Sequence, residues 1–159
     1  MKVAELMMRT VYTCKPDDSL AAAAALMWDH DVGCTPVVDA DRHVVGLITD
    51  RDICMATYTR NAAPAKIEVA TVMSRYVFSC SPNEALIDAE EVMREHRVRR
   101  VPVVDDRGTL VGIVSLNDLA QEAMREQARR GRAVRAEEVT TTLAAVGEPR
   151  QPRELVPAA

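Results

Sequence analysis

The chain of 159 residues is 48% hydrophobic, 28% charged and only 3% aromatic, and it carries a formal net charge of −4. This composition predicts a globular cytoplasmic protein with an aliphatic core, and the negative charge argues against nucleic acid or an anionic membrane as the main partner, because both require a positive field. The longest apolar run, Leu20 to Trp28, is too short to span a bilayer, and Glu5 and Arg9 interrupt any secretory leader.

An internal repeat organises the sequence. Residues 3–56 align with residues 69–122 at a constant offset of 66 positions, without a gap. Each half is too small to bury an adequate core alone, so we expect the halves to fold together. The predicted organisation is repeat one at 1–60, a linker at 61–68, repeat two at 69–124, and a C-terminal helical extension with a loose tail at 125–159. Matched pairs include Cys14/Cys80, Pro16/Pro82, His30/His96, Pro36/Pro102, Gly46/Gly112 and Asp52/Asp118.

In the first repeat, the residue pattern predicts the element order αβαββα. A short helix at 3–7 and a short strand at 11–14 precede a longer helix, which opens with Lys15-Pro16-Asp17-Asp18 and ends near His30. Two apolar runs, 35–39 and 44–49, predict a hairpin. A closing helix at 50–59 follows, with Thr49 as its expected N-cap.

The second repeat predicts the same elements in the same order. After a short helix at 69–73 and a strand at 77–80, the long helix opens with the capping box Ser81-Pro82-Asn83-Glu84 and ends around His96. A hairpin at 101–105 and 110–115 leads to a closing helix from Leu116 to about Arg130, with Ser115 as its expected N-cap. Residues 134–146 predict one more helix, and the proline-containing segment that follows predicts a loose tail.

The sequence shows no catalytic constellation, and we expect no enzyme activity, no metal and no required cofactor. The patterns of zinc proteases, serine hydrolases, dinucleotide-binding loops and phosphate-binding loops are absent. Asp29-His30-Asp31 is explained more simply by a helix end than by a metal site, because His96 repeats His30 without flanking aspartates. The cysteines lie far apart without a C-x-x-C pair, so we expect buried structural thiols, with a redox or metal role as the alternative; they are Cys14, Cys34, Cys54 and Cys80.

Two helix starts carry the same pair of candidate ligand-binding side chains. Thr49 with Asp52, and Ser115 with Asp118, place a hydroxyl and a carboxylate on one face, one turn apart. The carboxylates could accept hydrogen bonds from a ribose diol, and the hydroxyls, with nearby helix N-terminal amides, could meet phosphate oxygens. The alternative is that both pairs are only helix caps. An adenine ring also needs an apolar slot with backbone donors and acceptors, for which the candidates include Thr13, Thr35, Pro36, Ser79, Val101 and Pro102.

Two phrases occur in both repeats at the same spacing. They are Thr35-Pro36-Val37-Val38-Asp39 with Gly46-Leu47-Ile48-Thr49-Asp50-Arg51-Asp52, and Arg100-Val101-Pro102-Val103-Val104-Asp105 with Gly112-Ile113-Val114-Ser115-Leu116-Asn117-Asp118. In these phrases the chain resembles the CBS-domain family, named after cystathionine β-synthase, over roughly residues 3–122. The resemblance implies an α/β (α+β) fold in which two αβαββα repeats pack by their strands with pseudo-twofold symmetry, followed by a C-terminal helical extension. It also implies two inter-repeat clefts, which in relatives hold AMP, ADP, ATP or S-adenosylmethionine, and pairing of modules into a disc-like homodimer.

The repeats differ most just before the proline of the first strand of each hairpin. Repeat two has Arg97-Val98-Arg99-Arg100, where repeat one has Asp31-Val32-Gly33-Cys34. Arg99 and Arg100 match basic positions that contact phosphates in nucleotide-binding relatives such as the gamma subunit of AMP-activated kinase, and guanidinium groups suit phosphate well. We therefore expect the second site to be the better phosphate binder, and the first, with Gly33 and Cys34, to be weaker, empty, or filled by a less negative adenosyl ligand. The alternative is that these arginines form a solvated patch.

These observations predict a non-catalytic regulatory sensor that binds an adenine nucleotide or S-adenosylmethionine between its repeats and signals through a homodimer or an unknown effector protein. A ligand-free interaction scaffold with the same fold is the main alternative, and an enzyme is a second one. An arginine-rich stretch raises nucleic-acid binding as a third, although interspersed glutamates favour a solvated helix face. Its residues are Arg125, Arg129, Arg130, Arg132 and Arg135.

Overall fold

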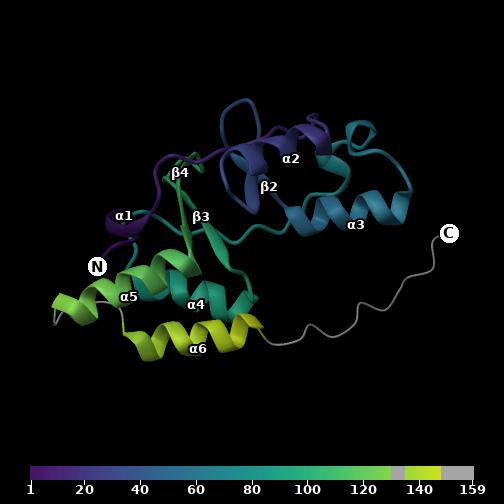
Figure 1. Cartoon of the computed structure of the whole chain (residues 1–159). Helices are drawn as coiled ribbons and strands as arrows, with labels where there is room; N and C mark the ends of the chain where they lie inside the picture. Colours follow the sequence, from purple (N-terminus) through teal and green to yellow (C-terminus); the bar gives the residue numbers. More distant parts are fainter. Residues whose placement is uncertain (130–134, 148–159) are drawn as a thin grey trace.

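The computed structural model describes residues 1–129 and 135–147, which form two similar halves followed by a C-terminal helix (Figure 1). The first half contains α2 (Leu20–Asp29), the hairpin strands β1 (Cys34–Val38) and β2 (Val44–Thr49), and α3 (Asp50–Arg60). The second half contains α4 (Leu86–His96), the strands β3 (Arg100–Val104) and β4 (Leu110–Ser115), and α5 (Leu116–Arg129). The predicted hairpins and closing helices are confirmed. Three short helical segments, α1 (Val3–Leu6), η1 (Pro64–Lys66) and η2 (Val69–Thr71), precede or join the halves.

The short segment that begins each repeat packs into the core of the other repeat. Val3 and Met7 belong to the hydrophobic cluster of the second half, whereas Val69 and Met73 belong to that of the first half. A backbone hydrogen bond also joins the first segment of repeat one to repeat two: Val3 N–H donates to the carbonyl of Glu84 at 3.0 Å. Each core is therefore completed by the opposite repeat, which confirms that the halves fold as one unit with pseudo-twofold symmetry.

A glycine in each half makes this exchange possible. A Cβ atom at Gly46 would lie 2.5 Å from the sulfur of Met73, and a Cβ atom at Gly112 would lie 2.6 Å from the sulfur of Met7. The methionine side chains could shift, but the same Cβ atoms would also lie 3.0 Å from the carbonyl oxygen of Ser74 and 3.1 Å from that of Met8, so a larger residue would press on the backbone of the exchanged segment.

The strands predicted at 11–14 and 77–80 are wrong as strands. In the first half a single parallel bridge remains, between Cys14 and Val37, held by hydrogen bonds from Cys14 N–H to the carbonyl of Pro36 and from Val38 N–H to the carbonyl of Cys14. The next bonds of a parallel ladder would require the N–H groups of residues 16 and 36, and both are prolines. Cys80 and Val103 repeat this arrangement between Pro82 and Pro102.

The long helix of each repeat begins later than predicted. The capping box at 81–84 forms a separate turn, in which Ser81 N–H donates to the Glu84 carboxylate at 3.1 Å, and α4 begins only at Leu86. The carbonyls of Pro82 and Glu84 accept hydrogen bonds from the exchanged α1, so they are not available to start a helix. In the first half α2 begins at Leu20, with Ser19 as its N-cap, so the carboxylates at 17 and 18 precede its first turn.

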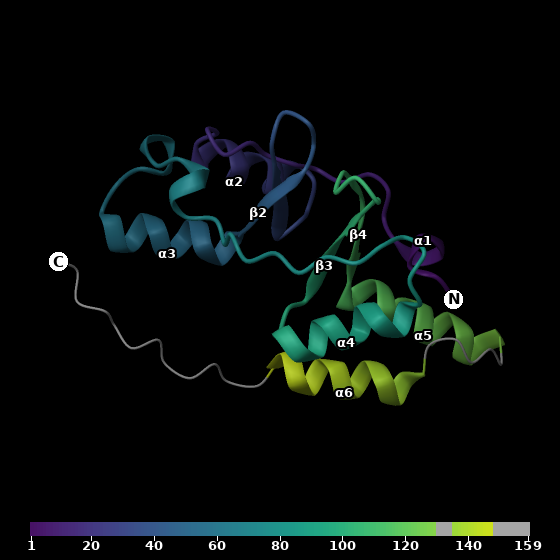
Figure 2. The ribbon, with the colours of Figure 1, turned by 180° about the vertical axis from the view of Figure 1, so that it is seen from behind.

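Helix α6 (Ala136–Gly147) lies along α4 and α5 and covers the outer face of the second half (Figures 1 and 2). Its buried side chains are Val139, Thr142 and Val146. A helix was predicted at 134–146, and this expectation is confirmed from Ala136 onward. The loose tail was predicted from Gly147 onward; Gly147 is the last residue of α6, and residues 148–159 lie outside the described residues.

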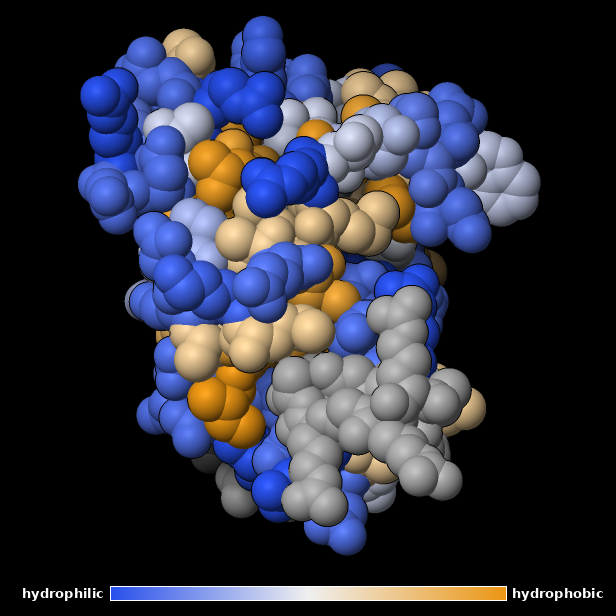
Figure 3. All heavy atoms as spheres, turned by 90° about the vertical axis from the view of Figure 1, so that its left-hand side faces the viewer, coloured by the Kyte–Doolittle hydropathy of each residue, from blue (hydrophilic) through white to orange (hydrophobic). Residues whose placement is uncertain are grey.

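The surface is hydrophilic with apolar interruptions. Figure 3 shows one such face, where apolar residues form a band between hydrophilic groups. Among the residues that the structure describes, no helix has both the length and the apolar character needed to cross a membrane.

Candidate ligand-binding site

Each repeat positions a hydroxyl and a carboxylate at the start of its closing helix. Thr49 Oγ1 donates to Asp52 Oδ2 at 2.7 Å, and Asp52 N–H donates back to Thr49 Oγ1 at 3.2 Å. Thr49 N–H donates to the same carboxylate oxygen at 3.0 Å. Thr49 is therefore the N-cap of α3, as predicted, and the pair forms a reciprocal capping box.

The second repeat reproduces this geometry. Ser115 Oγ and Ser115 N–H donate to Asp118 Oδ2 at 2.6 and 2.8 Å, and Asp118 N–H donates back to Ser115 Oγ at 3.3 Å. The cap interpretation is thus correct for both pairs, but it uses only one oxygen of each carboxylate. Within the described part of the chain, Oδ1 of Asp52 and Oδ1 of Asp118 have no hydrogen-bond partner, so both can accept from a ligand.

The predicted slot residues divide into buried and accessible ones. Thr35 is fully buried, and its hydroxyl donates to the carbonyl of Tyr12, so this side chain is structural. Pro36, Val101 and Pro102 are also buried. Thr13 is half-buried and Ser79 is exposed, and both directly precede the bridge residues Cys14 and Cys80 beside the hairpins.

Two stacked ring pairs, which the sequence analysis missed, fix these extended segments. Tyr12 stacks on His30 with ring centroids 3.6 Å apart, and Phe78 stacks on His96 at 3.5 Å. The signal was present in the sequence, because residues 12 and 78 share the offset of 66 that relates the two histidines. The histidines at the helix ends therefore have a packing role in both repeats.

Arg100 reaches from the second repeat to the first. Its guanidinium lies 3.7 Å from the position that a Cβ atom of Gly33 would occupy, and Asp50 Oδ2 lies 3.1 Å from the same point. Burial raises the pKa of the neighbouring Cys34 thiol to about 11, while the charge of Arg100 lowers it and those of Asp52 and Asp50 raise it. One cation and two carboxylates thus converge beside Gly33 and Cys34. Arg99, by contrast, is exposed in the second repeat.

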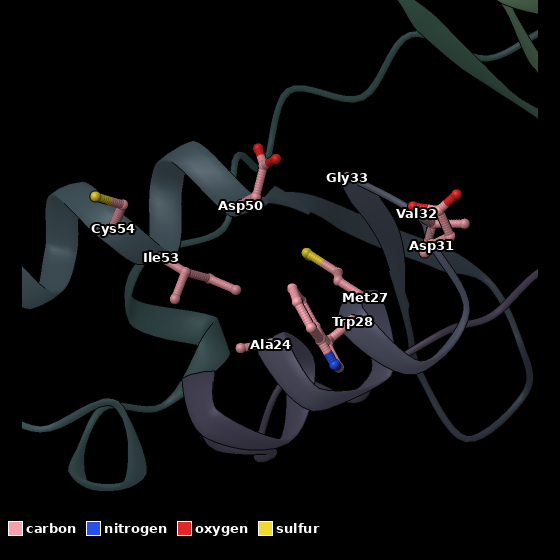
Figure 4. Close-up of a pocket in the computed structure, with 9 residues that line it drawn as sticks. All are labelled: Ala24, Met27, Trp28, Asp31, Val32, Gly33, Asp50, Ile53 and Cys54. Atoms are coloured by element: carbon pink, nitrogen blue, oxygen red, sulfur yellow. The ribbon is translucent and has the colours of Figure 1, made fainter.

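A cavity of about 400 Å³ lies between α2 and α3, on the outer face of the first half. Figure 4 shows Met27 and Trp28 of α2 and Ile53 of α3 pointing into the space between the helices, with the Asp50 carboxylate pointing away from it. Of the predicted ligand-binding residues, only Gly33 lines this cavity, and the first residue of α3, Asp50, lines it as well. Its lining residues are Ala24, Met27, Trp28, Asp31, Val32, Gly33, Asp50, Ile53 and Cys54.

The expectation of buried thiols holds for three cysteines and is wrong for the fourth. Cys14, Cys34 and Cys80 are buried, whereas Cys54 is exposed at the rim of the cavity on α3. Burial, as the largest cause, raises the pKa of Cys14 and of Cys80 to about 12. The described residues contain no group of three or more His, Cys, Asp or Glu side chains that could hold a metal ion.

The arginine-rich stretch is described only in part. Arg125 is exposed on α5, and its guanidinium donates to the Glu122 carboxylate at 3.4 Å, as on a solvated helix face. Arg130 and Arg132 lie outside the described residues.

Comparison with known proteins places both repeats in one family of domains. The CBS domain matches residues 3–58 and 69–125. The CBS domain-containing protein YhcV of Bacillus subtilis is 41% identical over 122 residues, which are 77% of this chain and 85% of that protein. Hypoxic response protein I, whose crystal structure has two coordinated zinc ions, is similar with a TM-score of 0.70 and 30% identity, over 76% of this chain and 98% of that one.

A further solved structure shows ligands in a similar domain pair. It is the CBS domain pair of protein MJ0100 in complex with 5′-methylthioadenosine and S-adenosyl-L-methionine. Its TM-score is 0.72 at 26% identity, and the match covers 79% of this chain and 98% of that one.

Proposed function

The chain belongs to the CBS-domain family, and we propose that its two repeats form a non-catalytic regulatory module that binds an adenine-containing ligand at the junction between the halves. The observation that carries this proposal is the duplicated hydroxyl–carboxylate pair at the starts of α3 and α5. In both pairs Oδ2 holds the helix cap and Oδ1 is left to accept a hydrogen bond. A ribose diol supplies donors of the required kind.

The charges around the two helix starts support different ligands at the two sites. Beside Asp52, the cation of Arg100 is offset by the carboxylate of Asp50. In the second repeat, Leu116 takes the position of Asp50, and Arg99 takes that of Gly33. The second site is therefore more positive and suits a phosphate-bearing adenine nucleotide, whereas the first suits an adenosyl compound without net negative charge. The ligands of the MJ0100 domain pair are adenosyl compounds of the kind proposed here for the first site.

Isothermal titration calorimetry with Asp52→Asn and Asp118→Asn tests both statements. Asp118→Asn should weaken ADP binding about 10- to 100-fold, because a hydrogen bond to a charged group contributes roughly 1.5–3 kcal/mol. Asp52→Asn should have this effect on S-adenosylmethionine instead. Asp88→Asn is the matched control, because Asp88 accepts from the Ala85 N–H at the start of α4, where neither repeat offers a ligand site.

Equal losses of both ligands in both variants would refute the assignment of charges while leaving the adenine site in place. Absence of binding by the wild-type chain would refute the ligand function and leave a protein-interaction scaffold.

We place the homodimer contact of the module on the open face of α2 and α3. This face has a cavity lined mainly by apolar residues, with Asp31 and Asp50 also in its lining, and Trp28 is 87% exposed. Among the described residues, α6 covers the corresponding face of the second half but not this face of the first half (Figure 1). The signal would then pass to the second copy or to an effector protein. Four unpaired thiols support a reducing compartment, the cytoplasm.

A further inference from the structure

A buried carboxylate lies beneath the C-terminal helix without a full set of partners. Glu90 on α4 is 1% exposed, and its Oε2 atom has no hydrogen-bond partner among the described residues. An uncompensated buried charge is costly, so a group of this kind usually changes its protonation state or its surroundings.

The internal repeat identifies what buries Glu90. The equivalent position in the first half is Ala24, which is only half-buried and lines the cavity between α2 and α3. The two faces are equivalent, but within residues 1–129 and 135–147 the covering α6 side chains Val139, Thr142 and Val146 lie on the second face alone. The α2/α3 face therefore has Ala24 where the α4/α5 face has the carboxyl group of Glu90.

The charges around Glu90 do not neutralise it. Burial is the main cause that raises its pKa to about 7; Glu138 on α6 raises it further, and Arg94 on α4 lowers it. Arg94 is shared with Glu91, at 3.7 Å. From the described part of α5, the side chains in this core are the uncharged Leu116, Leu119 and Ala123.

We propose that α6 is an exchangeable helix, which covers its own α4/α5 face when Glu90 is neutral and docks in the α2/α3 groove of a second copy when Glu90 is ionised. This inference rests on the homodimer contact proposed above and names the segment that makes it. The groove fits α6 because it repeats the face on which α6 already lies, and Ala24 stands there in place of the buried carboxyl group of Glu90. Asp31 and Asp50 also line the groove, at other positions of that face. The partner is therefore the same helix in trans.

The direction and size of the pH effect follow from Glu90. Its pKa is raised from 4.5 to about 7, so docking of α6 on its own chain is fully favoured below pH 4.5 and weakens as pH rises to 7. The total weakening is about 300-fold, because each pKa unit is a factor of ten. The change levels off about one pH unit above 7, because half of the docked Glu90 carboxyls are still protonated at pH 7.

Sedimentation velocity of the full chain at pH 5 and pH 8 tests the exchange, with hydrogen exchange of residues 136–147 as a second measurement. The wild type should be monomeric with a protected α6 at pH 5 and dimeric at pH 8. Glu90→Gln has no charge to release and should stay monomeric with α6 protected at both values. Ala24→Glu puts a carboxyl group in the groove, so at pH 8 it should expose α6 without forming a dimer.

Three results would overturn the proposal. A wild type that is monomeric with a protected α6 at pH 8 would show that ionised Glu90 does not release the helix. A Glu90→Gln variant that dimerises as the wild type does would refute the exchange while leaving the homodimer itself. An Ala24→Glu variant that still dimerises at pH 8 would show that the groove is not the docking site. Gly33 and Asp50 belong both to the groove and to the first ligand site, so the proposed ligand function is tested separately at the second site, with Asp118→Asn.

Discussion

Replacement of Gly112 by alanine should destabilise the whole protein, although it adds a single methyl group. The new Cβ atom would lie 2.6 Å from the sulfur of Met7 and 3.1 Å from the carbonyl oxygen of Met8. The methionine side chain can move, but the carbonyl is fixed, because Met8 and Ile113 exchange backbone hydrogen bonds of 2.9 and 3.0 Å. Overpacking of this kind costs about 1–3 kcal/mol, which should lower the melting temperature by roughly 2–12 °C in a protein of this size.

Thermal unfolding followed by circular dichroism measures this change. Gly147→Ala is the matched control, because nothing lies within 4 Å of its new Cβ atom, and its effect should remain within about 0.5 kcal/mol. Gly46→Ala should behave like Gly112→Ala, since Met73 lies against it from the other repeat. If Gly112→Ala melts with the wild type, the N-terminal segment does not pack on the second half, and the exchanged arrangement is wrong.

Three further predictions concern single side chains. Glu90→Gln should raise the free energy of unfolding in urea by about 2–3 kcal/mol at pH 8 and much less at pH 4.5. The reason is that the pKa of Glu90 is raised, so its ionised form destabilises the fold only as pH rises toward 7. An equal gain at both pH values would contradict this reason. A thiol reagent at pH 8 should modify Cys54 in the native protein and the other three cysteines only after unfolding, since burial raises the pKa of Cys14, Cys34 and Cys80; rapid labelling of two or more thiols would argue against the buried positions. Thr35→Val should cost about 1–3 kcal/mol in chemical denaturation, because it leaves the Tyr12 carbonyl without its hydroxyl donor, whereas Thr59→Val on the exposed end of α3 should cost little.

The sequence predicted those parts of the fold that depend on local pattern. Alternation of apolar residues located both hairpins, and Thr49 and Ser115 marked the starts of the closing helices, because an N-cap is defined by residues within one turn. The repeat itself predicted that both halves share one architecture.

The errors concern interactions between distant segments. The strand at 11–14 is reduced to one bridge by a pair of prolines, Pro16 and Pro36, which act together only once the chain has folded. The capping box at 81–84 is a correct turn signal, but its carbonyls bind the exchanged α1 instead of starting a helix. Both repeats have the same sequence pattern, so the pattern does not indicate that the first segment of each repeat packs on the other repeat.

The candidate site was predicted by type and only partly by place. The hydroxyl–carboxylate pairs are where the sequence put them. Arg100, in contrast, was grouped with Arg99 as part of the second site, and the structure places it beside Gly33 of the first. The burial of Glu90 was not foreseen, because the helix that covers it, α6, lies more than forty positions away in the sequence.

Thermal unfolding of the purified chain with S-adenosylmethionine, AMP and ADP, with GMP as the control, tests the central claim most directly. An adenine ligand at about 100 times its dissociation constant should add on the order of 2.7 kcal/mol to the free energy of unfolding for each site. The account predicts a clear rise in melting temperature with at least one adenine compound, a smaller or absent rise with GMP, and loss of the effect when Asp52 and Asp118 are both changed to asparagine. A melting temperature that none of these compounds changes would contradict it.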